Sequence, residues 1–166
     1  MAKPELSNAE LFRIYYYDAP PFEGTVANPI DGSLTDFSAL ASSRRAKALS
    51  DALELKPNFA VRRGMVNDAG WKLGSAALRN LASAPRAITA RDLVPDLRQK
   101  GVDMRIGLDI AFISLRKVAD VLVLVTGDSD FVPAMKFARR EGMRVYLEHM
   151  GHGVLRALKA HADIVL

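Results

Sequence analysis

The spacing of apolar and polar residues predicts a chain of short, alternating strands and helices. Apolar runs rich in aromatic and β-branched residues predict strands at 11–18, 59–66, 120–127, 144–150 and 163–166. Apolar residues at helical spacing predict helices at 34–55, 104–118, 129–142 and 153–162. Thr35 is the candidate N-cap of the first helix, because threonine side chains accept hydrogen bonds from the first free amides.

Three segments give weaker patterns. The segment 19–32 is dense in Pro and Gly and is expected to be a loop. The segment 71–82 is ambiguous between an edge strand and a helix, and 88–101 is polar and interrupted by Pro95.

The order of elements after residue 104 indicates the fold class. Helix, strand, helix, strand, helix and strand follow one another, and this alternation predicts parallel strands with helices on both faces. We therefore expect an α/β protein with a Rossmann-like, three-layer fold and a mostly parallel central sheet. No internal repeat or second domain is evident, so residues 1–166 are expected to form a single domain.

Composition and charge narrow the function classes. The chain has no cysteine, which excludes disulfides, thiolate zinc sites and cysteine nucleophiles and fits an intracellular, cytoplasmic location. No apolar run is long enough for a transmembrane helix, and the opening residues MAKPELSNAELF lack the apolar segment of a secretory signal. The net charge of +4 is compatible with a polyanionic partner such as nucleic acid.

The stretch VLVLVTGDSDF carries the most specific chemistry. A buried strand ends at Gly127, and Asp128 and Asp130 follow one residue apart. Ligands of parallel sheets bind beyond the carboxyl ends of the strands, and two close carboxylates favour a bound cation. Helix capping explains one of these aspartates but not readily both.

A second acidic pair lies upstream, in KGVDMRIGLDIA. Asp103 occupies the N-cap if the helix begins there, whereas Asp109 is a lone carboxylate among apolar residues. Their separation of six positions corresponds to a rotation of roughly 600°, so the two do not share one stripe of the helix. Oxygen-rich sites of this kind suit Mg²⁺ or Mn²⁺. His149, by contrast, is interpreted as a surface residue.

Together the two acidic stretches resemble the NYN domain, a PIN-like family, and its LabA-type bacterial members. The segment FRIYYYDAP also resembles these members. The resemblance implies a Rossmann-like parallel sheet, an acidic cluster at its carboxyl edge and metal-dependent ribonuclease activity on RNA. It makes Asp103, Asp109, Asp128 and Asp130 the candidate catalytic residues.

The resemblance also implies a first strand ending in a FIDGxN-like motif, central to the sheet, which would supply a metal ligand. No such motif precedes the tyrosine-rich strand here. We therefore expect either a sequence that is truncated at its N-terminus or a member that has lost a ligand.

The expected mechanism uses one or two Mg²⁺ or Mn²⁺ ions held by Asp109, Asp128 and Asp130. Candidate substrate-binding residues are Lys100, Arg105, Thr126 and Arg139. A catalytically inactive RNA- or protein-binding module is the alternative, and a homodimer also stays open. A third hypothesis is an enzyme with an acidic site of the Toprim-like or phosphatase-like kind. In such an enzyme the KGVD stretch would have no role.

Overall fold

A computed structural model describes residues 6–166, so the first five residues of the opening segment lie outside the described residues. The chain divides into two compact units. One contains the residues up to Ile14 together with Asp103–Leu166, and we call it the parallel-sheet unit. The other contains Tyr15–Val102, and we call it the hairpin unit.

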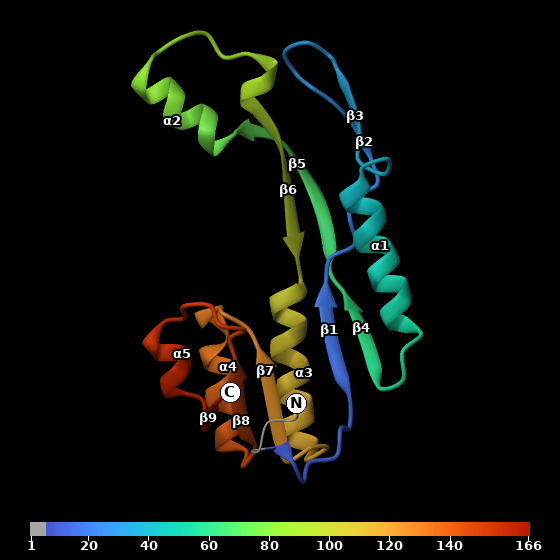
Figure 1. The fold of residues 1–166 in the computed structure, drawn as a ribbon, viewed down its shortest axis with the longest axis vertical. Coiled ribbons are helices and arrows are strands. Elements are labelled where there is room, and N and C mark those ends of the chain that lie inside the picture. The colour runs from blue at the N-terminus through green and yellow to red at the C-terminus, as the bar shows by residue number, and fades with distance from the viewer. Residues whose placement is uncertain (1–5) are drawn as a thin grey trace. The chain divides into compact units, whose positions relative to one another are not determined.

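The parallel-sheet unit alternates helices and strands, as the sequence predicts (Figure 1). Three parallel strands pair in the order β7-β8-β9, and β7 is therefore an edge strand of this sheet. The elements are α3 (Val102–Arg116), β7 (Val121–Val125), the short 3-10 helix η3 (Ser129–Phe131), α4 (Val132–Arg140), β8 (Arg144–Glu148), α5 (Arg156–Ala160) and β9 (Ile164–Val165).

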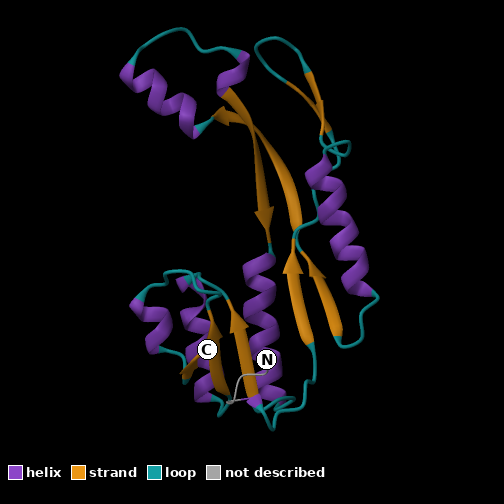
Figure 2. Ribbon diagram, in the orientation of Figure 1, coloured by secondary structure: helices purple, strands orange, loops and turns teal. Residues whose placement is uncertain are grey.

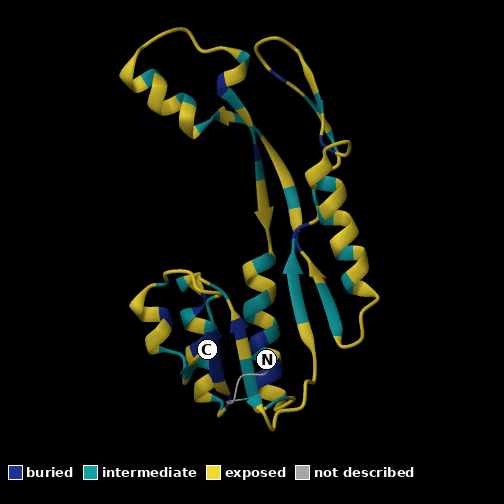
Figure 3. Ribbon diagram, viewed as in Figure 1, coloured by how far each residue is buried: buried dark blue, intermediate teal, exposed yellow. Residues whose placement is uncertain are grey.

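The core of this unit lies around β8 (Figure 3). Val145 and Leu147 of β8, Met135 of α4 and Leu158 of α5 are all 0% exposed. The middle of β8 is buried on both faces, which explains why its sequence, RVYLE, is apolar throughout the centre instead of alternating. Such a core fixes the strand ends at which the acidic residues lie.

Helix α3 is apolar on two faces. Ile110 and Ile113 are buried, and Ser114 Oγ is satisfied inside the core by the carbonyl of Ile110 at 2.7 Å. A second row of large apolar side chains at helical spacing is exposed and comprises Met104, Leu108, Phe112 and Leu115. Asp109 therefore lies on a helix that has little polar surface of its own.

The hairpin unit is built mainly from two-stranded pairs (Figure 2). Strand β1 pairs with β4, β2 pairs with β3, and the longer β5 and β6 form an antiparallel hairpin whose connection contains α2. The elements are β1 (Ile14–Asp18), β2 (Thr25–Ala27), β3 (Leu34–Asp36), α1 (Ala41–Glu54), β4 (Phe59–Arg63), β5 (Met65–Leu73), α2 (Ser75–Ser83), the short 3-10 helix η2 (Ala90–Asp92) and β6 (Leu93–Lys100).

The start of the first helix was predicted wrongly. Residues 34–36 form a strand, α1 begins at Ala41, and its N-cap position is Leu40 instead of Thr35. The segment 19–32, expected to be a loop, contains the partner strand β2. The hairpin forms because the Asn28 amide donates to the Ser33 carbonyl at 2.8 Å and Gly32, at φ +71°, allows the tight turn.

The predicted strand at 59–66 is two strands that meet at Gly64. A Cβ at Gly64 would lie 2.8 Å from the Lys100 carbonyl oxygen, so the close backbone approach requires glycine. The ambiguous segment 71–82 contains both alternatives, since β5 ends at Leu73 and α2 begins at Ser75.

The polar segment at 88–101 contains strand β6, in spite of Pro95. In a two-stranded pair each strand has one open edge, where a missing amide costs no ladder hydrogen bond. Pro95 pairs with Trp71 across the hairpin.

The observed class is α/β, as predicted, but the sheets are small and only partly parallel. One central sheet between two helical layers is not confirmed. None of the helices in residues 6–166 combines the length and the apolar character that crossing a bilayer requires.

Candidate acidic site

The loop after β7 is fixed by its own backbone and side chains. The Thr126 amide donates to the Glu148 carbonyl at 3.2 Å, which extends the parallel ladder by one residue. The Thr126 hydroxyl accepts a hydrogen bond from the Asp128 amide at 3.1 Å. Thr126, predicted to position a phosphate or a water, therefore positions the acidic loop itself.

Asp128 is an N-cap. Its Oδ1 accepts a hydrogen bond from the Asp130 amide at 2.9 Å, at the start of η3, which leads directly into α4. Phe131, 7% exposed, anchors this turn in the core. The capping interpretation therefore accounts for the position of Asp128.

Asp130 has no such role. It lies in the first turn of η3, is exposed, and within residues 6–166 no hydrogen bond or ion pair of its carboxylate is described. Capping thus explains one aspartate and leaves the other without a structural explanation.

The upstream aspartates lie on α3. The helix begins at Val102, so Asp103 lies in its first turn and is not the N-cap. Asp109 is half-buried next to the buried Ile110. Among the described residues, no group of three or more His, Cys, Asp or Glu side chains is close enough together to hold a metal ion. The predicted set of Asp109, Asp128 and Asp130 therefore stays a prediction.

The candidate phosphate contacts fall into different environments. Arg105 is exposed on α3, and Lys100 is exposed at the end of β6 in the hairpin unit. Arg139 forms an ion pair with Asp163, with Nη2 to Oδ1 at 2.9 Å. Asp163 also accepts a hydrogen bond from the Val145 amide at 2.8 Å. Arg139 thus links α4 to the chain entering β9.

Sequence reasoning missed a carboxylate at the neighbouring strand end. Glu148 is the register partner of Val125 in the parallel pair, so it ends β8 beside the acidic loop. Its Oε1 accepts a hydrogen bond from the Met150 amide at 2.8 Å. The parallel strand order was the available signal, because it places consecutive strand ends at one edge.

His149, interpreted as a surface residue, is half-buried, and its Nδ1 is a buried atom with no hydrogen-bond partner in the described part of the chain.

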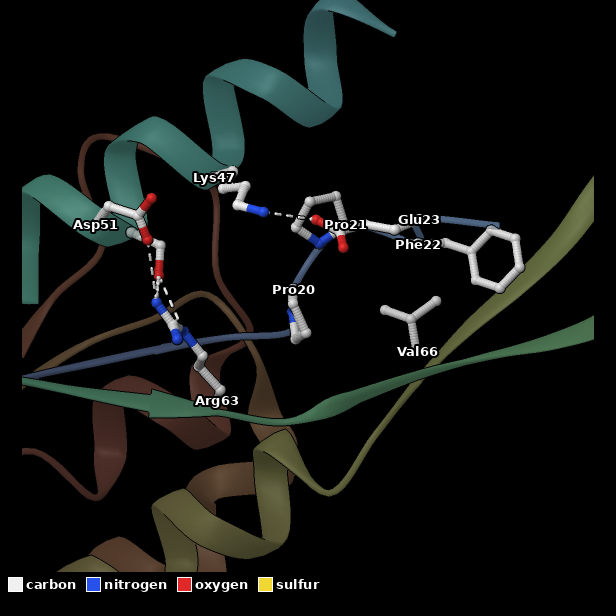
Figure 4. A pocket seen from close by; sticks show the side chains of 9 residues that line it. Pro20, Pro21, Phe22, Glu23, Lys47, Asp51, Arg63 and Val66 are labelled. Atoms are coloured by element: carbon white, nitrogen blue, oxygen red, sulfur yellow. Dashed lines mark hydrogen bonds and ion pairs between the residues drawn. The ribbon is translucent and has the colours of Figure 1, made fainter. Parts of the chain in front are cut away.

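A cavity of about 320 Å³ lies elsewhere, in the hairpin unit (Figure 4). Its charged residues pair with each other, since Lys47 binds Glu23 at 3.0 Å and Arg63 binds Asp51 at 3.4 Å. None of the predicted site residues lines it. We therefore assign the candidate site to the acidic loop and not to this cavity.

The family model of the NYN domain matches residues 30–165, and the chain belongs to this family. The match covers both acidic stretches. No significant match was found among curated proteins or among solved structures. The family agrees with the predicted resemblance and points to a PIN-like, RNA-related domain.

Proposed function

We propose that this protein is a metal-dependent ribonuclease that hydrolyses RNA phosphodiester bonds at the acidic loop. The observation that carries the proposal is the exposed pair Asp128 and Asp130 at the carboxyl end of a parallel strand in an NYN chain. Asp128 is held by its capping bond, whereas Asp130 is open to solvent. The capping bond thus holds one carboxylate in place, and the second is accessible to a cation from solvent.

The donor set suits Mg²⁺ or Mn²⁺. Mg²⁺ in nucleotide-processing sites takes one or two carboxylates and completes its shell with water and substrate phosphates, so a cage of three protein ligands is not required. Asp128 and Asp130 supply two carboxylates, and Asp109 is the proposed third acidic residue. A bound divalent ion lowers the pKa of a water and offsets charge on the leaving oxygen.

The other residues have supporting roles in this proposal. Thr126 fixes the loop, Arg105 attracts the phosphate backbone, and Asp103 adds negative charge to the first turn of α3. Lys100, in the hairpin unit, stays a predicted phosphate contact. Arg139 would contact phosphate only by sharing its ion pair with Asp163.

The finer architecture belongs to the same proposal. We propose that both units form one domain of LabA-type NYN character, cytoplasmic and with a Rossmann-like, three-layer arrangement. The alternation of helices and strands from α3 to β9 supports the Rossmann-like part of this proposal. A homodimer also stays a prediction.

The test is cleavage of a fluorescent RNA, single-stranded or structured, by the purified protein. We expect cleavage with Mg²⁺ or Mn²⁺ that EDTA stops, and loss of cleavage in Asp130→Asn and Asp109→Asn. Asp120→Asn is the matched control, because Asp120 is an exposed aspartate at the opposite end of β7. Cleavage that survives in both site variants would refute the metal site.

The second candidate function is an RNA-binding module without catalysis. One observation favours it: the described residues gather no group of three metal-ligating side chains. This alternative predicts RNA binding that weakens steeply with salt, no cleavage, and no effect of Mn²⁺ on the melting temperature. The cleavage and melting assays therefore separate the two functions.

A further inference from the structure

The hairpin of β5 and β6 carries most of the net charge of the protein. The chain has a net charge of +4, and residues 65–100 contribute six basic and three acidic residues, a net charge of +3. The basic residues are Lys72, Arg79, Arg86, Arg91, Arg98 and Lys100. The charge is therefore localised on one supersecondary element.

Two of the three acidic residues of this hairpin are buried and engaged. Asp92 is 5% exposed, and its carboxylate accepts hydrogen bonds from Arg86 Nη1 and Nη2, each at 2.6 Å. Asp96 is 7% exposed, and its carboxylate accepts hydrogen bonds from Lys72 Nζ at 2.7 Å and Arg98 Nη2 at 2.6 Å. Around Asp92 and Asp96, the charged groups that are exposed to solvent are therefore the basic side chains bound to these carboxylates.

One face of the hairpin collects these cations. Asp96, Arg98 and Lys100 alternate along β6, so they share a face, and Lys72 reaches Asp96 from β5. The side chains of Lys72 and Arg98 remain 57% and 64% exposed while bound to Asp96. Both Nε and Nη2 of Arg98 bind the same carboxylate oxygen, so its orientation is fixed.

The opposite face has a different character. It carries apolar side chains that are half-buried: Val66, Trp71, Leu73, Leu93, Pro95 and Leu97. The hairpin is therefore two-faced, with an apolar side that packs and a cationic side that lies in solvent.

We propose that the face formed by Lys72, Arg98 and Lys100 binds the phosphodiester backbone of single-stranded RNA. Alternate residues of a strand lie roughly 6.6–6.8 Å apart, a separation comparable with that of successive phosphates along an extended nucleotide chain. Asp96 is a positioning residue that holds Lys72 and Arg98 toward the solvent. This inference rests on the proposed function, in which RNA is the partner, and it adds a second RNA-binding surface to the protein.

The test measures binding of a labelled oligouridine by fluorescence anisotropy, in EDTA and at several salt concentrations. We expect Lys72→Gln/Arg98→Gln/Lys100→Gln to weaken binding and to reduce the slope of log K against log salt by about 2, since each single-strand phosphate contact contributes about 0.7. A variant that removes three other exposed cations of the hairpin unit is the control: Arg44→Gln/Arg45→Gln/Lys56→Gln. Equal losses of RNA affinity in both variants would show that binding depends only on the net charge of the protein, and this would overturn the proposal.

Asp96→Asn tests the positioning role separately. It raises the net charge by one, so a general electrostatic attraction predicts tighter binding. Loss of the fixed geometry predicts weaker binding, which we expect. Trp71, the single tryptophan, reports by its fluorescence whether the hairpin stays folded. Tighter binding by a folded Asp96→Asn variant would refute the positioning role.

Three further outcomes separate this inference from its alternatives and from the proposed activity. An oligoglutamate of equal charge that competes as well as RNA would assign the surface to acidic proteins and overturn the proposal. A wild type that cleaves RNA while the triple variant binds it normally would overturn only the hairpin surface. Loss of binding in the triple variant, without cleavage by the wild type, would support the surface and reject the ribonuclease.

Discussion

Replacing Asp128 separates the capping role of its side chain from its charge. Asparagine caps a helix about as well as aspartate, whereas alanine costs about 1 kcal/mol, within a range of about 0.5–2 kcal/mol. The bond at stake joins Asp128 Oδ1 to the Asp130 amide at 2.9 Å. We therefore expect Asp128→Asn to unfold at nearly the wild-type temperature and Asp128→Ala to melt about 2–4 °C lower.

Asp130→Asn completes the comparison. The Asp130 side chain makes no described capping bond, so the melting temperature of this variant should be close to that of the wild type. All three variants should lose metal-dependent RNA cleavage. Stability would then depend on the capping bond of Asp128, whereas cleavage would depend on the negative charges of Asp128 and Asp130.

The assays are thermal unfolding followed by circular dichroism, and cleavage of a labelled RNA with Mn²⁺. Equal destabilisation by Asp128→Asn and Asp128→Ala would show that the charge, and not the capping bond, stabilises this turn. Full cleavage activity in the Asp128→Asn variant would show that the reaction does not need the Asp128 carboxylate. Either result would refute the corresponding half of the reasoning.

Three other predictions concern the core, pH and metal. Leu147→Ala, at a fully buried site in β8, should cost about 2–5 kcal/mol in urea unfolding, while Val165→Ala, at a site 40% exposed, should cost much less. Arg86 and the Thr89 amide hold the pKa of Asp92 well below its usual range, so this stabilisation is present above about pH 4 and is lost as the pH falls further. Asp92→Asn should therefore show a weaker loss of stability between about pH 4 and 2, measured by Trp71 fluorescence, and an unchanged pH profile would contradict the ion pair. Mn²⁺ at about 100 times its Kd should stabilise the wild type by about 2.7 kcal/mol and leave an Asp128→Asn/Asp130→Asn variant unchanged.

The parallel-sheet unit could be predicted closely from the sequence because its elements are determined by burial. The prediction at 120–127 corresponds to β7 at Val121–Val125, and the prediction at 144–150 corresponds to β8 at Arg144–Glu148. Short apolar runs that are rich in β-branched or aromatic residues and bounded by turn residues are typical of buried strands.

The hairpin unit was predicted less well because short-range hydrogen bonds and partners decide its structure. Helical spacing placed residues 34–36 in a helix, but the hairpin turn pairs them with β2, and Asp36 then accepts a hydrogen bond from the Ser38 amide at 2.9 Å. Phe37 packs edge-on against Phe22, with ring centroids 5.5 Å apart. None of these partners is visible in a local hydrophobic pattern.

The site was predictable in part for the same reasons. Asp128 and Asp130 follow directly from the end of a buried strand, and the prediction that capping explains only one of them agrees with the geometry. Glu148 was missed because its proximity depends on the pairing of β7 with β8. A single sequence does not give that register.

The fold itself does not require the charges of the acidic loop. Asparagine at position 128 would supply the same capping acceptor, and the exposed side chain at position 130 makes no described contact that would need a carboxylate. Asp96 shows the opposite arrangement, since its charge is fully used by Lys72 and Arg98. Asp92 and Asp96 thus organise cations within the protein, whereas a cation at the acidic loop remains part of the proposed function.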